Sequence, residues 1–402
     1  MYEVKNVKRL HIELSSRCNA SCPACSRNYS GGPVADDLEL TELSIDDIKR
    51  MVPEEIAKNL IGINFCGNVG DPGMAPDLLP ILEYFRGHSP KIVQQLRTNG
   101  GMRNEKFWTA LGKFYVKQPP PRDNHLFSKA GVVFSVDGLE DTNHLYRQGT
   151  VWKNIMRNVE AFIAAGGRAR WDFIVFAHNE HQVEEAEQLS KDMGFEKFQY
   201  KKSARFFSNS RAQTKEEHQA QNRKGHTTLL QAPTNPKYRN AVLDQLKAAA
   251  NPANVQTITV DNVVSVANLD NLQGMQNFST DPSKKKPVEH IWDEAVIDCK
   301  VAKEKNIYVT AEGILQPCCW TAGQMYLWYF KPKGAQIWKF IDEAGIDTLD
   351  ARKHSVKDIV HGDFFQKIIP ESWTKPSCAE GKNAMCAKIC GTKFSAFDEQ
   401  FK

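Results

Sequence analysis

The chain has 402 residues, more than one hydrophobic core usually serves, so we expect two packed units. Its 41% hydrophobic and 25% charged residues are ordinary for a globular protein, and a net charge of +4 gives no reason to expect nucleic-acid binding. No stretch reaches the length of a membrane span, and the first residues lack the uncharged apolar core of a secretory signal. We therefore expect a cytoplasmic protein with no membrane partner.

Short β-branched or apolar runs alternate with amphipathic stretches from residue 9 to about residue 203. The predicted strands are Arg9–Leu14, Gly62–Phe65, Ile92–Thr98, Val132–Val136, Trp171–Phe176 and Lys197–Lys202. The predicted helices begin after Ser44, which opens a sequence resembling a capping box, and continue at Asp77–Arg86, Asn104–Val116, Trp152–Ala165 and His181–Met193. Six strand–helix repeats predict a parallel α/β sheet, closed or partly closed, and such sheets bind ligands at the carboxyl ends of their strands.

The stretch from residue 204 to 290 is rich in Gln, Asn, Lys and Pro. One amphipathic helix, Tyr238–Ala250, and one β-like run, Val255–Val266, are expected within it. A structureless loop of this length is implausible inside a compact domain, so we expect a partly ordered insertion or linker. A solvated connector and a lid over the substrate both fit this composition. Residues 291–402 form the expected second unit, which is rich in cysteine and tryptophan.

Ten cysteines in a reducing compartment indicate metal ligation more readily than disulfides. Cys18, Cys22 and Cys25 follow the first predicted strand directly. Three thiolates can hold three irons of a [4Fe–4S] cluster and leave the fourth iron open to a substrate or cofactor. A structural zinc site needs a fourth ligand, which the neighbouring sequence does not offer, and buried core thiols would not gather in so polar a segment.

The C-x3-C-x2-C spacing resembles that of the radical S-adenosylmethionine (SAM) superfamily, and the resemblance extends over residues 1–203. It implies a partial (β/α)6 barrel of the TIM type, with a [4Fe–4S] cluster on Cys18, Cys22 and Cys25 and SAM on the open iron. It also implies a flavodoxin- or ferredoxin-type reductant, whose electron cleaves SAM to methionine and a 5′-deoxyadenosyl radical.

Turns at successive strand ends carry the resemblance further. The turn after the second strand stands where the family has a Gly-Gly-Glu-Pro-like motif, which implies that the methionine amino group is bound by Gly67, Asn68, Gly70 and Asp71. Other positions implied to bind SAM are Asn99 after the third strand, Ser135, Asp137 and Arg147 after the fourth, and Asn179 after the fifth. Many family members have an aromatic residue before the third cysteine, where this chain has Ala24, so adenine is left to backbone groups or to Tyr29.

A second group of cysteines lies near the carboxyl end of the chain. The runs Ile307–Thr310 and Gly313–Cys318 predict a β-hairpin that brings Cys299 and Cys318 together. With Cys378, Cys386 and Cys390 the pattern resembles the SPASM and twitch extensions of the superfamily, and implies an α+β domain with one auxiliary [4Fe–4S] cluster. The resemblance places Cys299, Cys318 and Cys390 among its ligands and leaves the fourth as Cys386 or Cys378.

A zinc ribbon is the alternative to the auxiliary cluster. Two cysteines, Cys319 and Cys66, have not yet been given a role. Cys319 is expected to point away from Cys318, because side chains alternate in an extended segment. Cys66, at the end of the second strand, is either a buried small hydrophobe or a catalytic donor of a hydrogen atom.

The resemblance implies abstraction of a substrate hydrogen atom, followed by a net oxidation or a crosslink. A ribosomally made peptide is the first substrate class, although with a first strand at residue 9 we expect no added leader-binding domain. A small-molecule dehydrogenase acting on a sugar or aminocyclitol, an epimerase, and a non-catalytic iron–sulfur protein are the alternatives.

Overall fold

An eight-stranded sheet organises the computed structural model, which describes residues 3–116, 131–208, 213–214, 216–222, 224–241, 243–244, 290–293, 295–327 and 334–392. The strand order is β12-β11-β1-β2-β3-β4-β5-β6, and every neighbouring pair is parallel except β11 and β12. The bounds are β1 Arg9–Ile12, β2 Gly62–Phe65, β3 Val93–Thr98, β4 Gly131–Ser135, β5 Ala169–Ile174, β6 Lys197–Lys201, β11 Asn306–Val309 and β12 Leu315–Gln316. The predicted parallel α/β sheet is confirmed, and within the described residues it does not close into a barrel.

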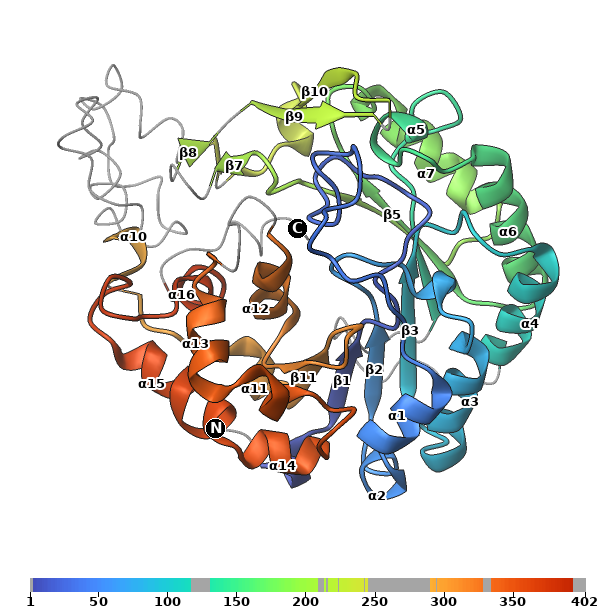
Figure 1. Ribbon diagram of the computed structural model, residues 1–402. Helices are drawn as coiled ribbons and strands as arrows, with labels where there is room; N and C mark the ends of the chain where they lie inside the picture. The colour runs from blue at the N-terminus through green and yellow to red at the C-terminus, as the bar shows by residue number, and fades with distance from the viewer. Residues whose placement is uncertain are drawn as a thin grey trace, which may run out of the picture.

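Helices cover the outer side of this sheet (Figure 1). They are α1 Ile45–Met51, α2 Glu54–Ala57, α3 Leu78–His88, α4 Glu105–Val116, α5 Asn143–Tyr146, α6 Trp152–Ala164 and α7 Val183–Asp192. The capping box expected at Ser44 is present, because its hydroxyl accepts the Asp47 N–H while the Asp47 carboxylate accepts the Ser44 N–H. The six strands and four longer helices predicted in this half each lie within two residues of their predicted bounds.

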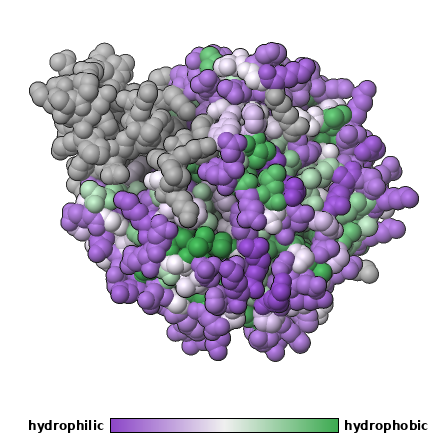
Figure 2. Space-filling model, viewed as in Figure 1, coloured by the Kyte–Doolittle hydropathy of each residue, from purple (hydrophilic) through white to green (hydrophobic). Residues whose placement is uncertain are grey.

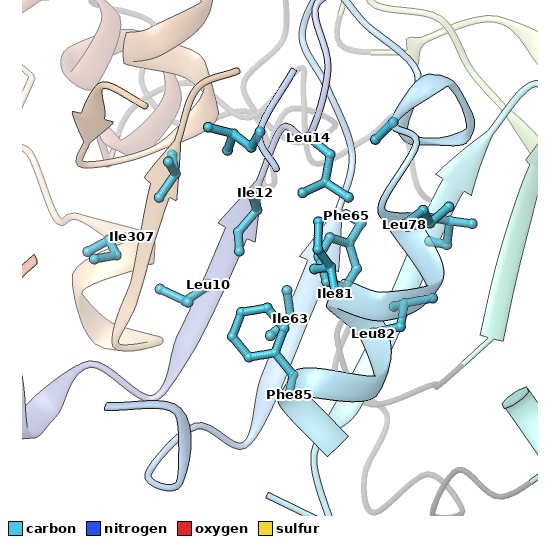
Figure 3. Close-up of a cluster of buried hydrophobic side chains, with 14 of the residues drawn as sticks. Leu10, Ile12, Leu14, Ile63, Phe65, Leu78, Ile81, Leu82, Phe85 and Ile307 are labelled. Carbon is cyan, nitrogen blue, oxygen red and sulfur yellow. The ribbon is translucent and has the colours of Figure 1, made fainter. Parts of the chain in front are cut away.

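Alternation along the strands separates an apolar outer face from a polar inner face. Leu10, Ile12, Ile63 and Phe65 point toward α3 (Figure 3), where they meet Leu78, Ile81, Leu82 and Phe85. Because successive side chains of a strand point to opposite faces, the residues between them face inward. These inward residues are polar, and they include His11, Glu13, Asn64, Arg97 and Asp172. The space-filling view likewise shows a largely hydrophilic outer rim, with hydrophobic residues gathered near the middle of the molecule (Figure 2).

The polar insertion contains two small antiparallel sheets that the sequence did not predict. The first pairs β7 (Phe207–Ser208) with β8 (Gln213–Thr214), and the second pairs β9 (Glu217–Gln221) with β10 (Thr227–Gln231). In the second sheet Ala220 and Leu230 alone are buried, so the strands lack the regular alternation by which half-buried strands are recognised. The expected run Val255–Val266 and most of the expected helix Tyr238–Ala250 lie outside the described residues.

The carboxyl-terminal segment adds the predicted hairpin to the main sheet. β11 and β12 pair antiparallel, and β11 lies parallel to β1, with Asn306 opposite Arg9. The helices of this segment, around the left of Figure 1, are α10 His290–Asp293, α11 Lys300–Lys303, α12 Cys319–Gly323, α13 Ile337–Ala344, α14 Val356–His361, α15 Ile369–Thr374 and α16 Ala384–Cys390. A π-helical turn, Phe364–Ile368, precedes α15. Short 3-10 turns span Val4–Asn6, Pro72–Met74, Glu180–Gln182, Pro236–Tyr238, Gln324–Tyr326 and Ile346–Leu349. None of the helices described is long and apolar enough to cross a membrane.

Candidate functional site

Cys18, Cys22 and Cys25 lie on the loop that follows β1, at the carboxyl end of the sheet. Buried Arg27 fixes this loop, since its guanidinium donates to the Ser16 and Ala20 carbonyls, each at 3.2 Å. The β9–β10 sheet packs beside the loop, and its Ala220 and Leu230 share a buried apolar cluster with Ala20 and Cys22. The loop is therefore held from the strand side and covered by the insertion.

The three thiols meet polar groups that come from other strand ends. The contacts are Asn99 Nδ2 to Cys18 Sγ (3.6 Å), Arg147 Nη1 to Cys22 Sγ (3.7 Å), and Cys25 Sγ to the Asn68 carbonyl (3.8 Å). No disulfide joins them. Burial raises the pKa of all three thiols, that of Cys25 to about 11. The thiols are therefore protonated at neutral pH, and a metal centre that binds them must displace those protons.

The Asp71 carboxylate joins the turn after β2 to the end of β3. Its oxygens accept hydrogen bonds from the Gly73 N–H (2.9 Å), the Thr98 hydroxyl (2.8 Å), the Asn99 N–H (2.8 Å) and the Asn99 side-chain amide (3.0 Å). A carboxylate has about four lone-pair positions, and these donors use them. Asp71 therefore fixes Asn99 beside Cys18. Because its carboxylate oxygens are already occupied, an ammonium group would have to be bound by the backbone carbonyls of the turn.

Glu13 is a site residue that the sequence reasoning missed. Buried at the end of β1, it accepts the N–H groups of Val69 (2.8 Å) and Gly70 (2.9 Å) on one oxygen and the Tyr308 hydroxyl (2.5 Å) on the other. Burial raises its pKa, and these hydrogen bonds act against that rise. A glutamate placed between two apolar residues at the end of a buried strand was the signal that could have revealed it.

Two glycines let this turn approach β1 closely. A Cβ at Gly67 would stand 2.4 Å from a Glu13 carboxylate oxygen, and a Cβ at Gly70 would stand 1.6 Å from the Ser15 carbonyl oxygen. Asn68, between them, donates its side-chain amide to the Tyr308 hydroxyl (3.1 Å) and to the Cys319 carbonyl (2.9 Å). Its side chain, which was expected to contact SAM, thus ties the turn to the carboxyl-terminal segment.

Asp137 and Arg147 form a buried ion pair beside Cys22. Arg147 Nε donates to Asp137 Oδ2 at 2.6 Å, and the Ile174 N–H donates to the other oxygen, also at 2.6 Å. Burial acts to lower the pKa of Arg147, but the hydrogen bond to Asp137 and the charges of Asp137, Cys22 and Tyr146 together outweigh burial and raise it. The guanidinium is therefore charged and held in place at the strand ends, and Ser135 lies half-buried at the end of the adjoining strand.

Asn179, which was expected to contact ribose or adenine, has its side chain hydrogen-bonded to the backbone of the neighbouring strand ends. Its side chain is fully buried, and its amide donates to the carbonyls of Asp137 (2.9 Å) and Ile174 (3.0 Å). Its side-chain oxygen accepts the Phe176 N–H at 2.7 Å. Both amide hydrogens are thus used by the backbone, which leaves none for a ligand.

Cys66 directly follows β2, and Cys319 is the first residue of α12. Burial raises the pKa of both thiols, and the imidazole of His11 donates to the Cys66 carbonyl at 2.8 Å. The extended segment expected at Cys319 is wrong, since this residue begins α12 and the alternation rule does not apply there.

Four cysteines of the second group gather around the start of α11 and the end of α16. Cys386 and Cys390 are one helical turn apart on α16, and Asp298, which precedes Cys299, donates its N–H to the Cys390 carbonyl at 2.9 Å. Cys318 immediately precedes α12, which contacts α16. Cys378, by contrast, packs in an apolar cluster with Trp292, Ala295 and Ala387.

Comparison with known proteins finds no matching protein-family model and no matching curated protein. Solved structures do match. Native anSMEcpe with bound AdoMet is 14% identical, with a TM-score of 0.50 over 98% of this chain and 95% of that chain. Streptococcus suis SuiB bound to S-adenosylmethionine is 16% identical, with a TM-score of 0.44 over 83% and 68% of the two chains. BtrN in complex with AdoMet and 2-DOIA is 13% identical, with a TM-score of 0.40 over 98% and 96%. At these identities the likeness concerns the fold alone.

Proposed function

We propose that this chain, which has the radical SAM fold, is a radical SAM enzyme. The observation that carries the proposal is the placement of Cys18, Cys22 and Cys25 on one fixed loop, beside the turn of Gly70 and Asp71. Three thiol ligands fit a [4Fe–4S] cluster with one open iron. When bound, the cluster supplies the electron that splits SAM into methionine and a 5′-deoxyadenosyl radical, which takes a hydrogen atom from the substrate.

The number of thiols at the first group supports a cluster rather than zinc, because three thiols leave one iron open whereas a structural zinc site needs a fourth ligand. Within the parts of the chain that the structure describes, no group of three or more His, Cys, Asp or Glu side chains is arranged to hold a single metal ion.

The chain's own groups suit the parts of SAM. Arg147, positioned by Asp137, offers a fixed guanidinium to the methionine carboxylate, and the carbonyls of the turn at Gly67–Gly70 suit the ammonium group. Tyr146, Ile174, Phe176 and Phe206 form an apolar wall on the same side as Cys22, suited to adenine. Ala220 and Leu230 of the β9–β10 sheet belong to the same apolar cluster, which supports a role for this part of the insertion as a cover over the site.

The second cysteine group is proposed to hold one auxiliary [4Fe–4S] cluster. Its ligands are Cys299, Cys318, Cys386 and Cys390, because these four gather while Cys378 packs among apolar side chains. When bound, this cluster supplies an acceptor for the second electron of a two-electron substrate oxidation. That role favours an oxidation or a crosslink over a redox-neutral rearrangement.

Replacing Cys386 with alanine is expected to leave the auxiliary cluster with three thiol ligands and one open iron, so the iron content of the anaerobically reconstituted protein should fall below about eight per chain and the visible absorbance should change. Cys378→Ala is the matched control and should retain about eight irons. Iron analysis and the visible absorbance of the two variants decide the assignment. The opposite result, with iron lost from Cys378→Ala alone, would make Cys378 the fourth ligand.

A peptide is the proposed substrate class, with a small-molecule dehydrogenase as the alternative. Structures of like fold include anSMEcpe with bound Cp18Cys peptide and BtrN in complex with 2-DOIA, so both classes have a precedent in this fold. A cytoplasmic location and a flavodoxin- or ferredoxin-type reductant remain part of the proposal.

The reconstituted protein, reduced with dithionite in the presence of SAM, is expected to form 5′-deoxyadenosine. The measurement is chromatographic quantification of that nucleoside, with SAM omitted as the control. Protein that carries about eight irons yet forms none would contradict the proposed function.

A further inference from the structure

Arg205 is a cation beside the first cysteine group that the proposed function does not use. It comes four residues after the end of β6, and its Nε donates to the Tyr146 hydroxyl at 3.0 Å. Its guanidinium carbon lies 5.8 Å from the centre of the Tyr146 ring. The guanidinium carbon of Arg147, whose Nη1 contacts the Cys22 thiol, lies 5.4 Å from the same ring centre. Tyr146 therefore links Arg205 to the side of the site where Cys22 lies.

The surroundings of Arg205 are largely aromatic. Phe206, the next residue, shares a buried cluster with Tyr146, Phe176 and Cys22. The ring centre of Phe176 lies 4.7 Å from that of Tyr146 and 6.1 Å from that of Phe206. A guanidinium partly withdrawn from water among such side chains is costly unless an anion or several acceptors replace the lost water.

Most of the hydrogen-bonding capacity of the Arg205 side chain is unused. A guanidinium has several N–H donors, and within the described residues the Tyr146 hydroxyl is the one acceptor that this side chain reaches. Asp137, the carboxylate beside neighbouring Arg147, already accepts from that arginine and from the Ile174 N–H. Arg205 is half-buried and its terminal nitrogens are not enclosed, so a ligand can reach them.

The fork of free N–H groups on Arg205 suits a carboxylate, because two parallel hydrogen bonds can form between the two planar groups. SAM carries one carboxylate, and Arg147 is already placed for it. That arginine contacts Asp137 through Nε and Cys22 through Nη1, which leaves its other terminal nitrogen for SAM. The guanidinium of Arg205 is therefore left for an anionic group of a second molecule.

We propose that Arg205 binds a carboxylate group of the substrate, such as the side chain of an acidic residue in a peptide. The ion pair would hold the substrate close to the apolar cluster that contains Cys22, and it would select acidic over neutral substrates. The inference rests on the proposed function, because it makes the carboxylate part of the substrate of a radical SAM enzyme.

The test is binding of the α-amide of N-acetylglutamate to the full-length reconstituted protein, with the α-amide of N-acetylglutamine as its neutral analogue of the same shape. Thermal protection is measured at constant ionic strength, with saturating SAM and no reductant. SAM then occupies its own carboxylate site, so protection reports a second one. Wild-type protein is expected to be protected by the glutamate compound and not by the glutamine compound.

Three variants separate binding from a structural role. Arg205→Gln is expected to bind the glutamate compound about tenfold more weakly, because charge-assisted hydrogen bonds are lost. Tyr146→Phe removes the acceptor of Arg205 Nε but leaves the guanidinium, so it should bind the compound nearly as well as the wild type. Arg168→Gln is the matched arginine control, since Arg168 directly precedes β5, at the opposite end of the sheet from the cysteine loop, and pairs with exposed Glu196.

The proposal is wrong if the two compounds protect the wild-type protein equally, or if neither protects it. Equal losses of binding in Tyr146→Phe and Arg205→Gln would give Arg205 a structural role only. Weaker binding of SAM to Arg205→Gln, with binding of the glutamate compound unchanged, would assign the guanidinium to SAM and overturn the proposal. Should Arg205→Gln fail to fold, Arg205→Lys takes its place, because lysine keeps the charge and loses the planar fork.

Failure of the proposed function gives a different result. Protein that binds no SAM and forms no 5′-deoxyadenosine contradicts the enzyme proposal, and the two compounds are then compared without SAM. A preference for the glutamate compound that Arg205→Gln loses would still support the carboxylate site. Formation of 5′-deoxyadenosine without that preference refutes the carboxylate site alone.

Discussion

Replacing Cys18, Cys22 and Cys25 together with alanine is expected to abolish the formation of 5′-deoxyadenosine, because no thiol remains to hold iron at the strand ends. The iron content should fall from about eight to about four per chain, the remainder belonging to the auxiliary cluster. Chromatography of the reduced reaction mixture and iron analysis of the same sample give both results.

Ser26→Ala is the control for this variant, since Ser26 directly follows Cys25 in the same loop and offers no thiol. It should keep both its iron and its nucleoside product. If the triple variant still cleaves SAM, the chemistry lies elsewhere in the chain and the central proposal fails.

Gly70→Ala is expected to lower the free energy of unfolding by about 3 kcal/mol and to weaken SAM binding at least tenfold. The added methyl group would stand 1.6 Å from the Ser15 carbonyl oxygen, so the turn must move away from β1. That movement breaks the hydrogen bonds that Glu13 accepts from Val69 and Gly70. Denaturant unfolding and equilibrium binding of SAM measure the two effects.

The same substitution at Gly87 provides the comparison. Gly87 is an exposed residue of α3, and a Cβ there meets nothing within 4 Å. Gly87→Ala should therefore stabilise the helix by about 0.5–1 kcal/mol, because alanine loses less backbone entropy on folding. Equal stability of the two variants would mean that the turn after β2 can relax, contrary to the close approach described here.

The parallel sheet could be predicted because its strands carry a local signal. Outward residues such as Leu10 and Phe65 are apolar at every second position, and the Ser44 cap marks the start of α1. The β9–β10 sheet could not be predicted, because it buries little more than the side chains of Ala220 and Leu230 and most of its other positions are polar. Its stability depends on the cysteine loop beneath it, which the local sequence does not specify.

The site could be predicted only in part, for a similar reason. Four residues could be identified because they follow predicted strands: Asp71, Asn99, Asp137 and Arg147. The structure brings them close to the loop that carries Cys18, Cys22 and Cys25. Position after a strand could not show that the Asn179 side chain turns into the backbone, because the hydrogen-bonding partners of a side chain depend on tertiary structure. The choice between Cys386 and Cys378 as the fourth ligand stays a proposal, which the helical spacing of Cys386 and Cys390 on α16 supports.

The pairing of β1 with β11 has a consequence for how the protein is made. Glu13 and Tyr308, which are hydrogen-bonded to each other, are separated by 295 positions along the chain. At synthesis rates of roughly 5–20 residues per second, β1 leaves the ribosome on the order of 15 to 60 s before β11 has been synthesised. Until β11 has been made, the loop of Cys18, Cys22 and Cys25 lacks part of its support. We therefore expect iron to be loaded there only when synthesis of the chain is nearly complete.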